Sequence, residues 1–349
     1  VVNRKLCGEG FPDWAVNRTD FPAPLEVDIS FDEQGHAKIA DCTKVDFWKF
    51  YSTNDVKNAW KAFYTDVDGI AESFTNFWRV VADYFKDEPN VLGYEIMNEP
   101  NAFDNSIVQQ LDKNYLQPLY QRVHKKIREV DNNTIIFFEP YTMDIVSIGF
   151  TEGPGGPEYN DRQVLSYHIY CPSVDRSGEP TDPAVCAAAD TASALLKTSA
   201  AKRLGIGAFM TEFGAVYDGP KSIDEINRVT NLADNYLHSW AYWQLKYYDD
   251  FTTLDMPGSV ESFYEVDGSL QMAKVRALTR TYAYATCGVP VSQSFDTQTG
   301  QYDFVYNVSQ QCNGKKTELY VSEDWYYATG FNYVFANCFQ CGLHRINEN

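Results

Sequence analysis

Short apolar segments alternate with helical segments from about residue 67, and this alternation limits the fold more than any other feature. The apolar segments are continuous runs, as expected for parallel strands that are buried on both faces and joined by crossover helices. The predicted strands are 91–97, 134–138, 164–170, 205–211 and 239–245, and the predicted helices are 67–85, 106–130 with a bend at Pro118, 191–204, 223–237 and 269–285. This pattern predicts an α/β fold of the (β/α)8 TIM barrel type, with its chemistry at the carboxyl ends of the strands.

A different pattern begins after Gly288, where short strand-like segments are separated by turn residues. The predicted strands here are 291–295, 302–307, 317–321 and 332–335, and Asn313-Gly314 is a strong turn signal. We expect a small antiparallel β-sandwich domain, which about four strands would leave incomplete. The predicted domains are therefore a barrel domain over 1–285 and a β-sandwich domain over 286–349.

The charge balance narrows the classes of partner. Lys and Arg total 29 against 48 Asp and Glu, which gives a net charge of −19. Nucleic acid is not expected as a partner, because phosphate backbones select clustered cations, and docking on anionic lipid by charge alone is disfavoured. Aromatic residues make up 15 % of the chain, and their flat faces suit stacking on sugar rings.

Cysteine and glycosylation patterns indicate the secretory pathway. The chain has eight cysteines, an even number that favours disulfides without giving their pairing. Cys171 and Cys186 flank a loop-like segment and are candidates for closing it, and Cys338 and Cys341 form a C-x-x-C pair that favours a disulfide over zinc. Asn-x-Ser/Thr sequons begin at Asn17, Asn132 and Asn307. We expect a secreted protein, or one of a lysosomal or digestive lumen.

Two predicted strands end in a glutamate, and this pair carries the fullest chemical signal in the sequence. Asn98-Glu99-Pro100 follows one strand, and because proline cannot donate to a sheet, the strand stops and Glu99 projects from its carboxyl end. Glu212 ends another strand 113 residues later, which corresponds to three strands further round a barrel. Two facing carboxyl groups suit glycoside hydrolysis, in which one protonates the leaving oxygen and the other attacks the sugar or activates water.

Three further side chains lie at predicted strand ends. His168 and Tyr170 are two residues apart and therefore point to the same side of one strand. The phenol of Tyr170 is expected to hydrogen-bond the nucleophile and hold its ionised form. Trp243 is expected to form the floor under the reacting sugar, with barrel packing as the alternative, whereas Trp60 and Trp78 are interpreted as core residues. The five histidines have no metal-ligand spacing and no Gly-rich phosphate loop occurs, so no metal or cofactor is predicted.

These motifs resemble glycoside hydrolase family 5, and within that family the endoglycoceramidases. The motifs that end the family's fourth, sixth, seventh and eighth strands are matched by Asn98-Glu99-Pro100, by His168 with Tyr170, by Glu212 and by Trp243. The segments 7–15, 211–215 and 243–249, together with the β domain that follows, carry the likeness to endoglycoceramidases.

The resemblance implies a retaining hydrolase that cleaves the β-glycosidic bond between oligosaccharide and ceramide in glycosphingolipids. Glu212 would be the nucleophile, Glu99 the acid/base, and Asn98 would hold the sugar 2-hydroxyl. This mechanism predicts carboxyl groups about 5–5.5 Å apart. Two alternatives stay open: a family 5 β-glycanase or β-glucosidase that acts on soluble sugars, and a non-catalytic fragment that binds glycans or glycolipids.

A comparison of strand counts shows one departure from the family. The family carries three strands before the Asn-Glu-Pro strand, whereas residues 1–66 look like the irregular loop that follows the third strand. The barrel is therefore expected to lack its first three strands in this chain, and a separate N-terminal segment is a candidate partner that completes it. The expected substrate is a glycosphingolipid, with transient contact to a membrane surface or lipid micelle. Candidate contacts for its acyl chains are Phe251, Met256, Val260, Phe263 and Tyr264.

Overall fold

The computed structural model describes residues 7–8, 10–16, 27–45, 47–143, 147–175, 177–246, 260–312, 314–336 and 342. Two compact units divide the chain, Val1–Leu278 and Thr279–Asn349. The separate domains expected over 1–285 and 286–349 stay a prediction, and the first compact unit ends at Leu278. Within the described ranges, none of the helices combines the length and apolar character needed to cross a membrane.

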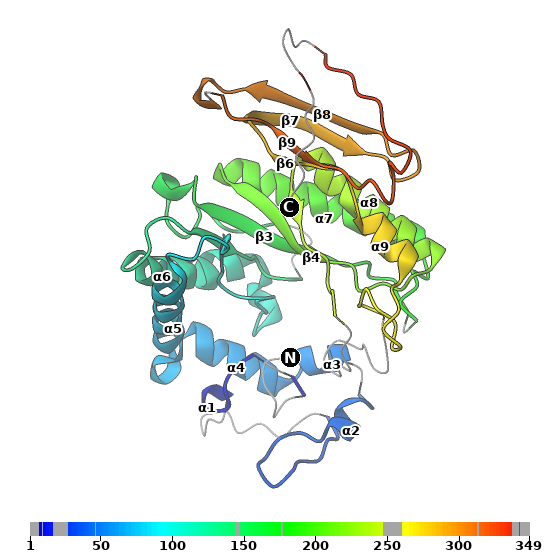
Figure 1. Cartoon of the computed structure of the whole chain (residues 1–349). Helices are drawn as coiled ribbons and strands as arrows, with labels where there is room; N and C mark the ends of the chain where they lie inside the picture. The colour runs from blue at the N-terminus through cyan, green and yellow to red at the C-terminus, as the bar shows by residue number, and fades with distance from the viewer. Residues whose placement is uncertain are drawn as a thin grey trace. The chain divides into compact units, whose positions relative to one another are not determined.

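Five parallel strands form the sheet of the first unit, in the order β1-β2-β3-β4-β5. They are β1 Gly93–Glu95, β2 Ile135–Phe138, β3 Gln163–Ile169, β4 Gly207–Phe213 and β5 Ser239–Trp240. Because the spatial order follows the sequence, each crossover joins neighbouring strands, as in the successive units of a barrel (Figure 1). The predicted α/β fold is confirmed, and the five strands are consistent with part of a (β/α)8 barrel.

The pairing of β3 with β4 contains a shift in register. Tyr167 pairs with Met210, but the next residue, His168, pairs with Glu212. Thr211 is therefore an extra residue in β4, which makes a β-bulge. The shift places His168 directly opposite Glu212, near the carboxyl ends of two adjacent strands.

Helices pack against the sheet and against one another. Those that lie between or after the strands are α5 Ile70–Phe85, α6 Gln117–Arg128, α7 Pro183–Leu204, α8 Pro220–Tyr236 and α9 Met272–Leu278. Helix α7 contacts β3 and β4, and α8 lies beside α7 (Figure 1). Helix α7 begins at Pro183, well before residue 191, where the helix was predicted to start. Asp182 caps it by accepting hydrogen bonds from the N–H groups of Ala184 and Val185. Gly205 ends it at a φ of 71°, a left-handed conformation that favours glycine.

Short helices precede the sheet, so the expectation of an irregular segment over 1–66 is wrong for part of that range. These helices are α1 Asp13–Val16, α2 Ile39–Cys42, α3 Phe47–Tyr51 and α4 Asn54–Tyr64. Helix α4 buries Val56, Trp60 and Phe63 along one face, at the three-to-four-residue spacing of an amphipathic helix. Trp60 is thus a core residue as predicted, and Trp78 packs against the same core.

The predicted helix over 106–130 is divided into three kinds of helical turn. A 3₁₀ segment, Asn105–Gln110, and a π-helical segment, Asp112–Leu116, precede α6. Pro118 lies just after the π-helical turn, and Leu116 and Gln117 before it keep helical φ and ψ. The wider turn therefore lies where the proline has no backbone N–H to donate. The bend at Pro118 stays a prediction.

The second unit is antiparallel, as predicted. Strand β6 Tyr282–Ala285 pairs with β9 Glu318–Tyr320, and β7 Gly288–Phe295 pairs with β8 Tyr302–Val308. The helix predicted over 269–285 is wrong in its second half, because α9 ends at Leu278 and the β-prone residues of β6 pair with β9. The strand predicted over 332–335 is not formed, although the structure describes those residues. A disulfide joins Cys287 to Cys312 across this unit.

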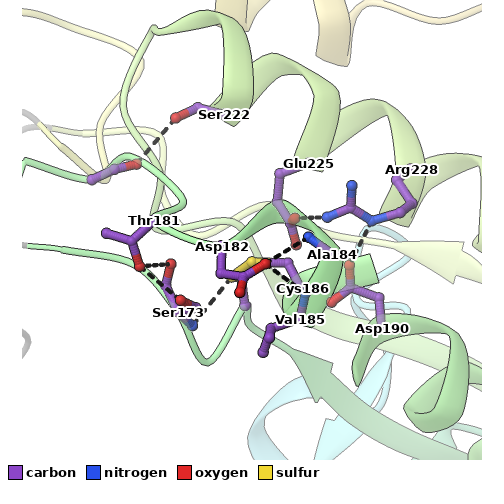
Figure 2. Close-up of a disulfide and its surroundings, with 12 residues drawn as sticks. Ser173, Thr181, Asp182, Ala184, Val185, Cys186, Asp190, Ser222, Glu225 and Arg228 are labelled. Atoms are coloured by element: carbon purple, nitrogen blue, oxygen red, sulfur yellow. Dashed lines mark hydrogen bonds and ion pairs between the residues drawn. A yellow bond between two sulfur atoms is a disulfide. The ribbon is translucent and has the colours of Figure 1, made fainter. Parts of the chain in front are cut away.

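A second disulfide, Cys171–Cys186, closes the connection from β3 to α7, as the sequence suggested (Figure 2). Beside it, Arg228 on α8 donates to Asp190 on α7 at 2.9 Å and also to Glu225. Asp190 and Glu225 are both buried, so the guanidinium supplies the charge that compensates them. A third disulfide joins Cys7 and Cys42, and the C-x-x-C pair lies outside the described residues.

We expect the double substitution Cys171→Ala with Cys186→Ala to destabilise the first unit. The bridge spans 15 residues, and losing a loop constraint of that length costs about 3 kcal/mol in the free energy of unfolding. Urea denaturation followed by circular dichroism measures this change. The control is the Cys287→Ala, Cys312→Ala double variant, whose effect should fall on the second unit. An unchanged unfolding midpoint in the first double variant would contradict the prediction.

Candidate active site

Every predicted site residue lies at or just beyond the carboxyl end of a strand in the five-stranded sheet. Glu99 follows β1, and Glu212 lies in β4. His168 lies in β3, and Tyr170 follows that strand directly. Trp243 follows β5 and forms an isolated parallel bridge with Gly214, just after β4. The strands β1, β3, β4 and β5 therefore bring these side chains to one edge of the sheet, as the barrel prediction requires.

Glu99 and Glu212 lie close together, with His168 between them. One carboxylate oxygen from each glutamate and one imidazole nitrogen of His168 all lie within 4.8 Å of one another. Nδ1 of His168 is 2.9 Å from Oε1 of Glu99 and 3.4 Å from Oε2 of Glu212. One oxygen of each carboxyl is therefore closer to the other than the roughly 6.5–9.5 Å typical of inverting enzymes, as the spacing of a retaining pair requires.

Glu212 is held by two polar neighbours. The hydroxyl of Tyr170 donates to Oε2 of Glu212 at 2.7 Å, and the same oxygen faces His168. Burial raises the pKa of Glu212 above its ordinary value, while the charge of His168 and the Tyr170 hydrogen bond oppose that rise. A carboxylate stabilised in this way, yet with 17 % of its side chain exposed, is suited to attack a sugar.

The charge of His168 is set by the carboxylates around it. Burial alone would lower the pKa of this imidazole, but the surrounding carboxylates, Glu139 first and then Glu99 and Glu212, raise it to about 9. The ring is therefore cationic at neutral pH. Nε2 of His168 has no hydrogen-bond partner among the described residues, so the polar contacts of the ring fall on Nδ1.

Asn98 is not joined to this cluster by the hydrogen bonds of the described residues. It directly precedes Glu99 and is exposed, so its amide stays accessible beside the acid/base candidate. Glu99 itself has a φ of 44°. This left-handed conformation is uncommon for a residue with a side chain and marks a constrained turn at the end of β1.

Trp243 is partly buried and is fixed by a carboxylate from a later segment of the chain. Its indole N–H donates to Oε2 of Glu261 at 2.9 Å, and the side-chain amide of Gln244 donates to the same oxygen at 3.1 Å. Glu261 is buried. The peptide bond between Trp243 and Gln244 is cis. The ring plane of Trp243 is thus set by a charge-assisted hydrogen bond.

We expect Trp243→Phe to lower kcat/KM by roughly tenfold, because a ring remains but the hydrogen bond that orients it is lost. Most of the fall should appear in KM, since stacking acts on the bound sugar before and during reaction. Steady-state kinetics on a β-lactoside measure the split, with Trp14→Phe as the control because Trp14 is exposed on α1. An unchanged KM would contradict the stacking role.

Sequence reasoning missed several acidic and phenolic side chains at this site. Glu139 directly follows β2, is 2 % exposed, and accepts a hydrogen bond from the backbone N–H of Glu99 at 2.6 Å. Glu95 in β1 accepts from the hydroxyl of Thr211 at 2.9 Å. A signal for Glu139 was present, because Glu139-Pro140 after a predicted strand repeats the arrangement of Glu99-Pro100.

Tyr51 is a further residue that the sequence did not indicate. It ends α3, far from the strands in sequence, yet the carboxylates of the site affect the pKa of its phenol. Burial, followed by the negative charges of Glu99, Glu212 and Glu139, raises the pKa of Tyr51 well above its ordinary value. A tyrosine from the segment before the sheet therefore lies near both carboxyls of the candidate pair.

The acyl-chain contacts proposed from sequence are only partly described. Phe251 and Met256 lie outside the described residues. Phe263 packs against the core of β3, β4 and α8, which fits ordinary packing, whereas Tyr264 is exposed. Val260 is described and partly buried. An apolar groove lined by these side chains stays a prediction.

Groups of possible metal ligands occur among the described residues. Glu99 with His168 and Glu212, and Glu95 with Glu139 and His168, are close enough to hold an ion. In both groups the described hydrogen bonds and ion pairs engage the carboxylates, and a cationic imidazole cannot ligate. Cys171 and Cys186 are joined in a disulfide and offer no thiolate beside Glu225. That no metal or cofactor takes part stays a prediction.

Two close glutamates at the carboxyl edge of a parallel sheet are the arrangement that a glycoside hydrolase uses, and comparison with known families agrees with that class. Residues 45–249 match the cellulase model of glycosyl hydrolase family 5, and residues 280–344 match the C-terminal domain of that family. The chain therefore belongs to glycoside hydrolase family 5.

Two relatives with similar sequences indicate which members of family 5 the chain resembles. The chain is 32 % identical over 342 residues to an endoglycoceramidase of Cyanea nozakii and 35 % identical over 347 residues to one of Hydra vulgaris. Each alignment covers 95 % of this chain, but only 65 % and 62 % of those relatives. The chain thus spans less than two thirds of the length of the curated relatives that it matches.

Solved structures share the fold. Endo-glycoceramidase II from Rhodococcus sp. in complex with ganglioside GM3 superposes with a TM-score of 0.71 at 21 % identity, covering 91 % of this chain and 66 % of that one. The same enzyme with a five-membered iminocyclitol gives a TM-score of 0.72 at 21 % identity and covers 93 % and 68 %. The fold of the solved enzyme is therefore shared over 91–93 % of this chain.

Proposed function

We propose that this chain carries an endoglycoceramidase activity, which hydrolyses the β-glycosidic bond between the glycan and the ceramide of a glycosphingolipid and retains the configuration at the anomeric carbon. The observation that carries the proposal is the Glu99–Glu212 pair at the ends of β1 and β4, with oxygens within 4.8 Å of one another. Similarity to curated endoglycoceramidases over 95 % of the chain supports the choice of substrate.

In the proposed mechanism, Glu212 attacks the anomeric carbon of the sugar next to ceramide. Glu99 protonates the departing ceramide oxygen and then, as base, activates the water that releases the glycan. Tyr170 and His168 stabilise the charge of Glu212 before attack, because both contact its Oε2. Asn98 holds the 2-hydroxyl and Trp243 stacks on the sugar ring. These roles are part of the proposal.

The proposed substrate is tested by comparing two classes of β-glycoside. The purified chain is incubated with GM3 or lactosylceramide in detergent micelles and, separately, with cello-oligosaccharides. We expect intact oligosaccharide and intact ceramide from the glycolipids, measured by mass spectrometry, and much slower release from soluble sugars. Preference for cello-oligosaccharides would support a β-glycanase or β-glucosidase instead, and binding without release would support a glycan-binding fragment.

Disulfides and exposed glycosylation sequons support a proposal for the cellular location of the protein. The described residues contain three disulfides, which persist in oxidising compartments, and the sequon residues Asn132 and Asn307 are exposed. We place the protein outside the cell or in a lysosomal or digestive lumen, with transient contact to a lipid surface. A closed barrel has eight strands, so we also propose that an N-terminal segment supplies further strands. The assay above, repeated with such a segment added, tests it.

A further inference from the structure

Glu139 lies between the two halves of the candidate site. It follows β2, and β2 is the strand between β1, which leads to Glu99, and β3, which carries His168. Pro140 follows it and ends the strand. With 2 % of its side chain exposed, Glu139 is the most buried of the carboxyls that contact His168, and the mechanism above gives it no role.

The two oxygens of Glu139 face two different neighbours. Oε2 accepts a hydrogen bond from the backbone N–H of Glu99 at 2.6 Å, and Oε1 lies 3.7 Å from Nδ1 of His168. The same Nδ1 is 2.9 Å from Oε1 of Glu99. One carboxyl group therefore contacts the main chain of the acid/base candidate and also faces the imidazole that contacts its side chain.

The backbone of Glu99 needs such a contact. A left-handed conformation for a residue other than glycine costs of the order of 1–3 kcal/mol and persists only where neighbouring groups hold it. Glu99 adopts a φ of 44°, and its N–H is bonded to Glu139. A turn held in this way fixes the direction in which the Glu99 side chain leaves the strand end.

The charges of Glu139 and His168 affect the pKa of each other. Burial raises the pKa of Glu139 to about 8, against the pull of the His168 charge. Glu139 in turn gives the largest upward contribution to the pKa of His168. The titratable groups that face this pair come from several elements: Tyr51 of α3, Glu95 of β1, Glu99 after β1, Tyr120 of α6 and Glu212 of β4.

We propose that Glu139 is a positioning residue for the acid/base: it holds the left-handed turn at Glu99 and keeps His168 in its cationic form beside Glu99. This inference rests on the proposed role of Glu99 in the glycosidase, but not on the identity of the glycolipid. It requires that Glu139 act both as a hydrogen-bond acceptor and as a titratable group.

Two substitutions that keep the approximate size of the glutamate side chain test the hydrogen-bond acceptor and the titratable group separately. Glu139→Gln keeps an oxygen that can accept from the Glu99 N–H but removes the titratable group. Glu139→Met removes both. The control is Glu129→Gln, because Glu129 follows α6, is exposed, and pairs with Arg79 and Lys126 among the described residues. Thermal melting of each variant establishes that it is folded.

The first measurement needs no turnover. Proton–nitrogen NMR of the imidazole, assigned with His168→Gln, follows the titration of His168 in the whole chain. We expect the proton to leave near pH 9 in the unsubstituted protein and about one pH unit lower in Glu139→Gln. If the two titration curves coincide, Glu139 does not act on His168 and the proposal is overturned.

The second measurement uses leaving groups that differ in their need for an acid. An alkyl β-lactoside requires protonation of the leaving oxygen, whereas a dinitrophenyl β-lactoside does not. For Glu139→Met we expect kcat/KM to fall by roughly 10²-fold on the alkyl substrate, because a misplaced acid is costly, and to fall by less than about threefold on the dinitrophenyl substrate. Glu139→Gln should lose less on the alkyl substrate. Equal losses on both substrates would overturn the proposal.

These measurements do not depend on ceramide release. A chain that cleaves β-lactosides but leaves GM3 intact would reject the proposed glycolipid substrate while Glu139 could still pass both tests. If no glycoside is cleaved, the titration of His168 alone decides whether Glu139 acts as proposed.

Discussion

Glu212→Ala is expected to lower kcat on a dinitrophenyl β-lactoside by roughly 10⁵-fold, because the variant lacks the group that forms the covalent bond to the sugar. An activated leaving group cannot compensate for a missing nucleophile. The environment of Glu212 supports this assignment, since Tyr170 donates to its Oε2 at 2.7 Å and His168 lies 3.4 Å from the same oxygen. Both contacts stabilise a carboxylate anion.

Azide provides a direct test of the role of Glu212. A small anion can enter the space left by the alanine and attack the sugar from the face that Glu212 uses. The product should then be the α-lactosyl azide, with configuration opposite to that of the β-substrate, and activity should partly return. NMR of the product identifies the anomer, and Glu129→Gln serves as the control. A β-azide from Glu212→Ala would assign the nucleophile to another residue.

The second large effect is expected for Glu99→Ala. On an alkyl β-lactoside or a glycolipid, loss of the general acid should lower kcat/KM by about 10³- to 10⁴-fold. On the dinitrophenyl substrate kcat/KM should change little, because that leaving group departs without a proton.

Azide distinguishes Glu99 from Glu212. In Glu99→Ala the glycosyl–enzyme intermediate still forms on Glu212, and azide replaces water as the second nucleophile. We expect the β-lactosyl azide, with the configuration of the substrate, and a higher kcat with azide than without it. A loss of activity that is equal for both leaving groups would show that Glu99 does not donate the proton.

The strand-end residues could be predicted because a local pattern determines their position. Glu99 and Glu212 each follow a short apolar run, and parallel strands bring such ends to one edge whatever the connections between them do. The same argument predicted His168 and Tyr170. It would have predicted Glu139 as well, but the run 134–138 was interpreted only as a buried strand, without regard to the Glu-Pro that follows it.

Other contributions could not be found from local pattern. Tyr51 and Glu261 reach the site from segments before and after the sheet, and nothing in their neighbouring sequence indicates that approach. The helix predicted over 269–285 failed for a related reason, since Tyr282–Ala285 pairs with a strand that lies more than 30 residues later in the chain. Tertiary pairing of that kind outweighs local helical periodicity.

The bulge at Thr211 lets two successive residues serve the same edge of the site. Side chains alternate between the two faces of a regular strand, so Thr211 and Glu212 would ordinarily point in opposite directions. Because Thr211 is the extra residue between Met210 and Glu212, Glu212 lies opposite His168, while the Thr211 hydroxyl donates to Glu95. Deleting Thr211 would restore an unbroken ladder in which Glu212 still lies opposite His168, so the deletion would remove the bond to Glu95 and leave the nucleophile candidate in place.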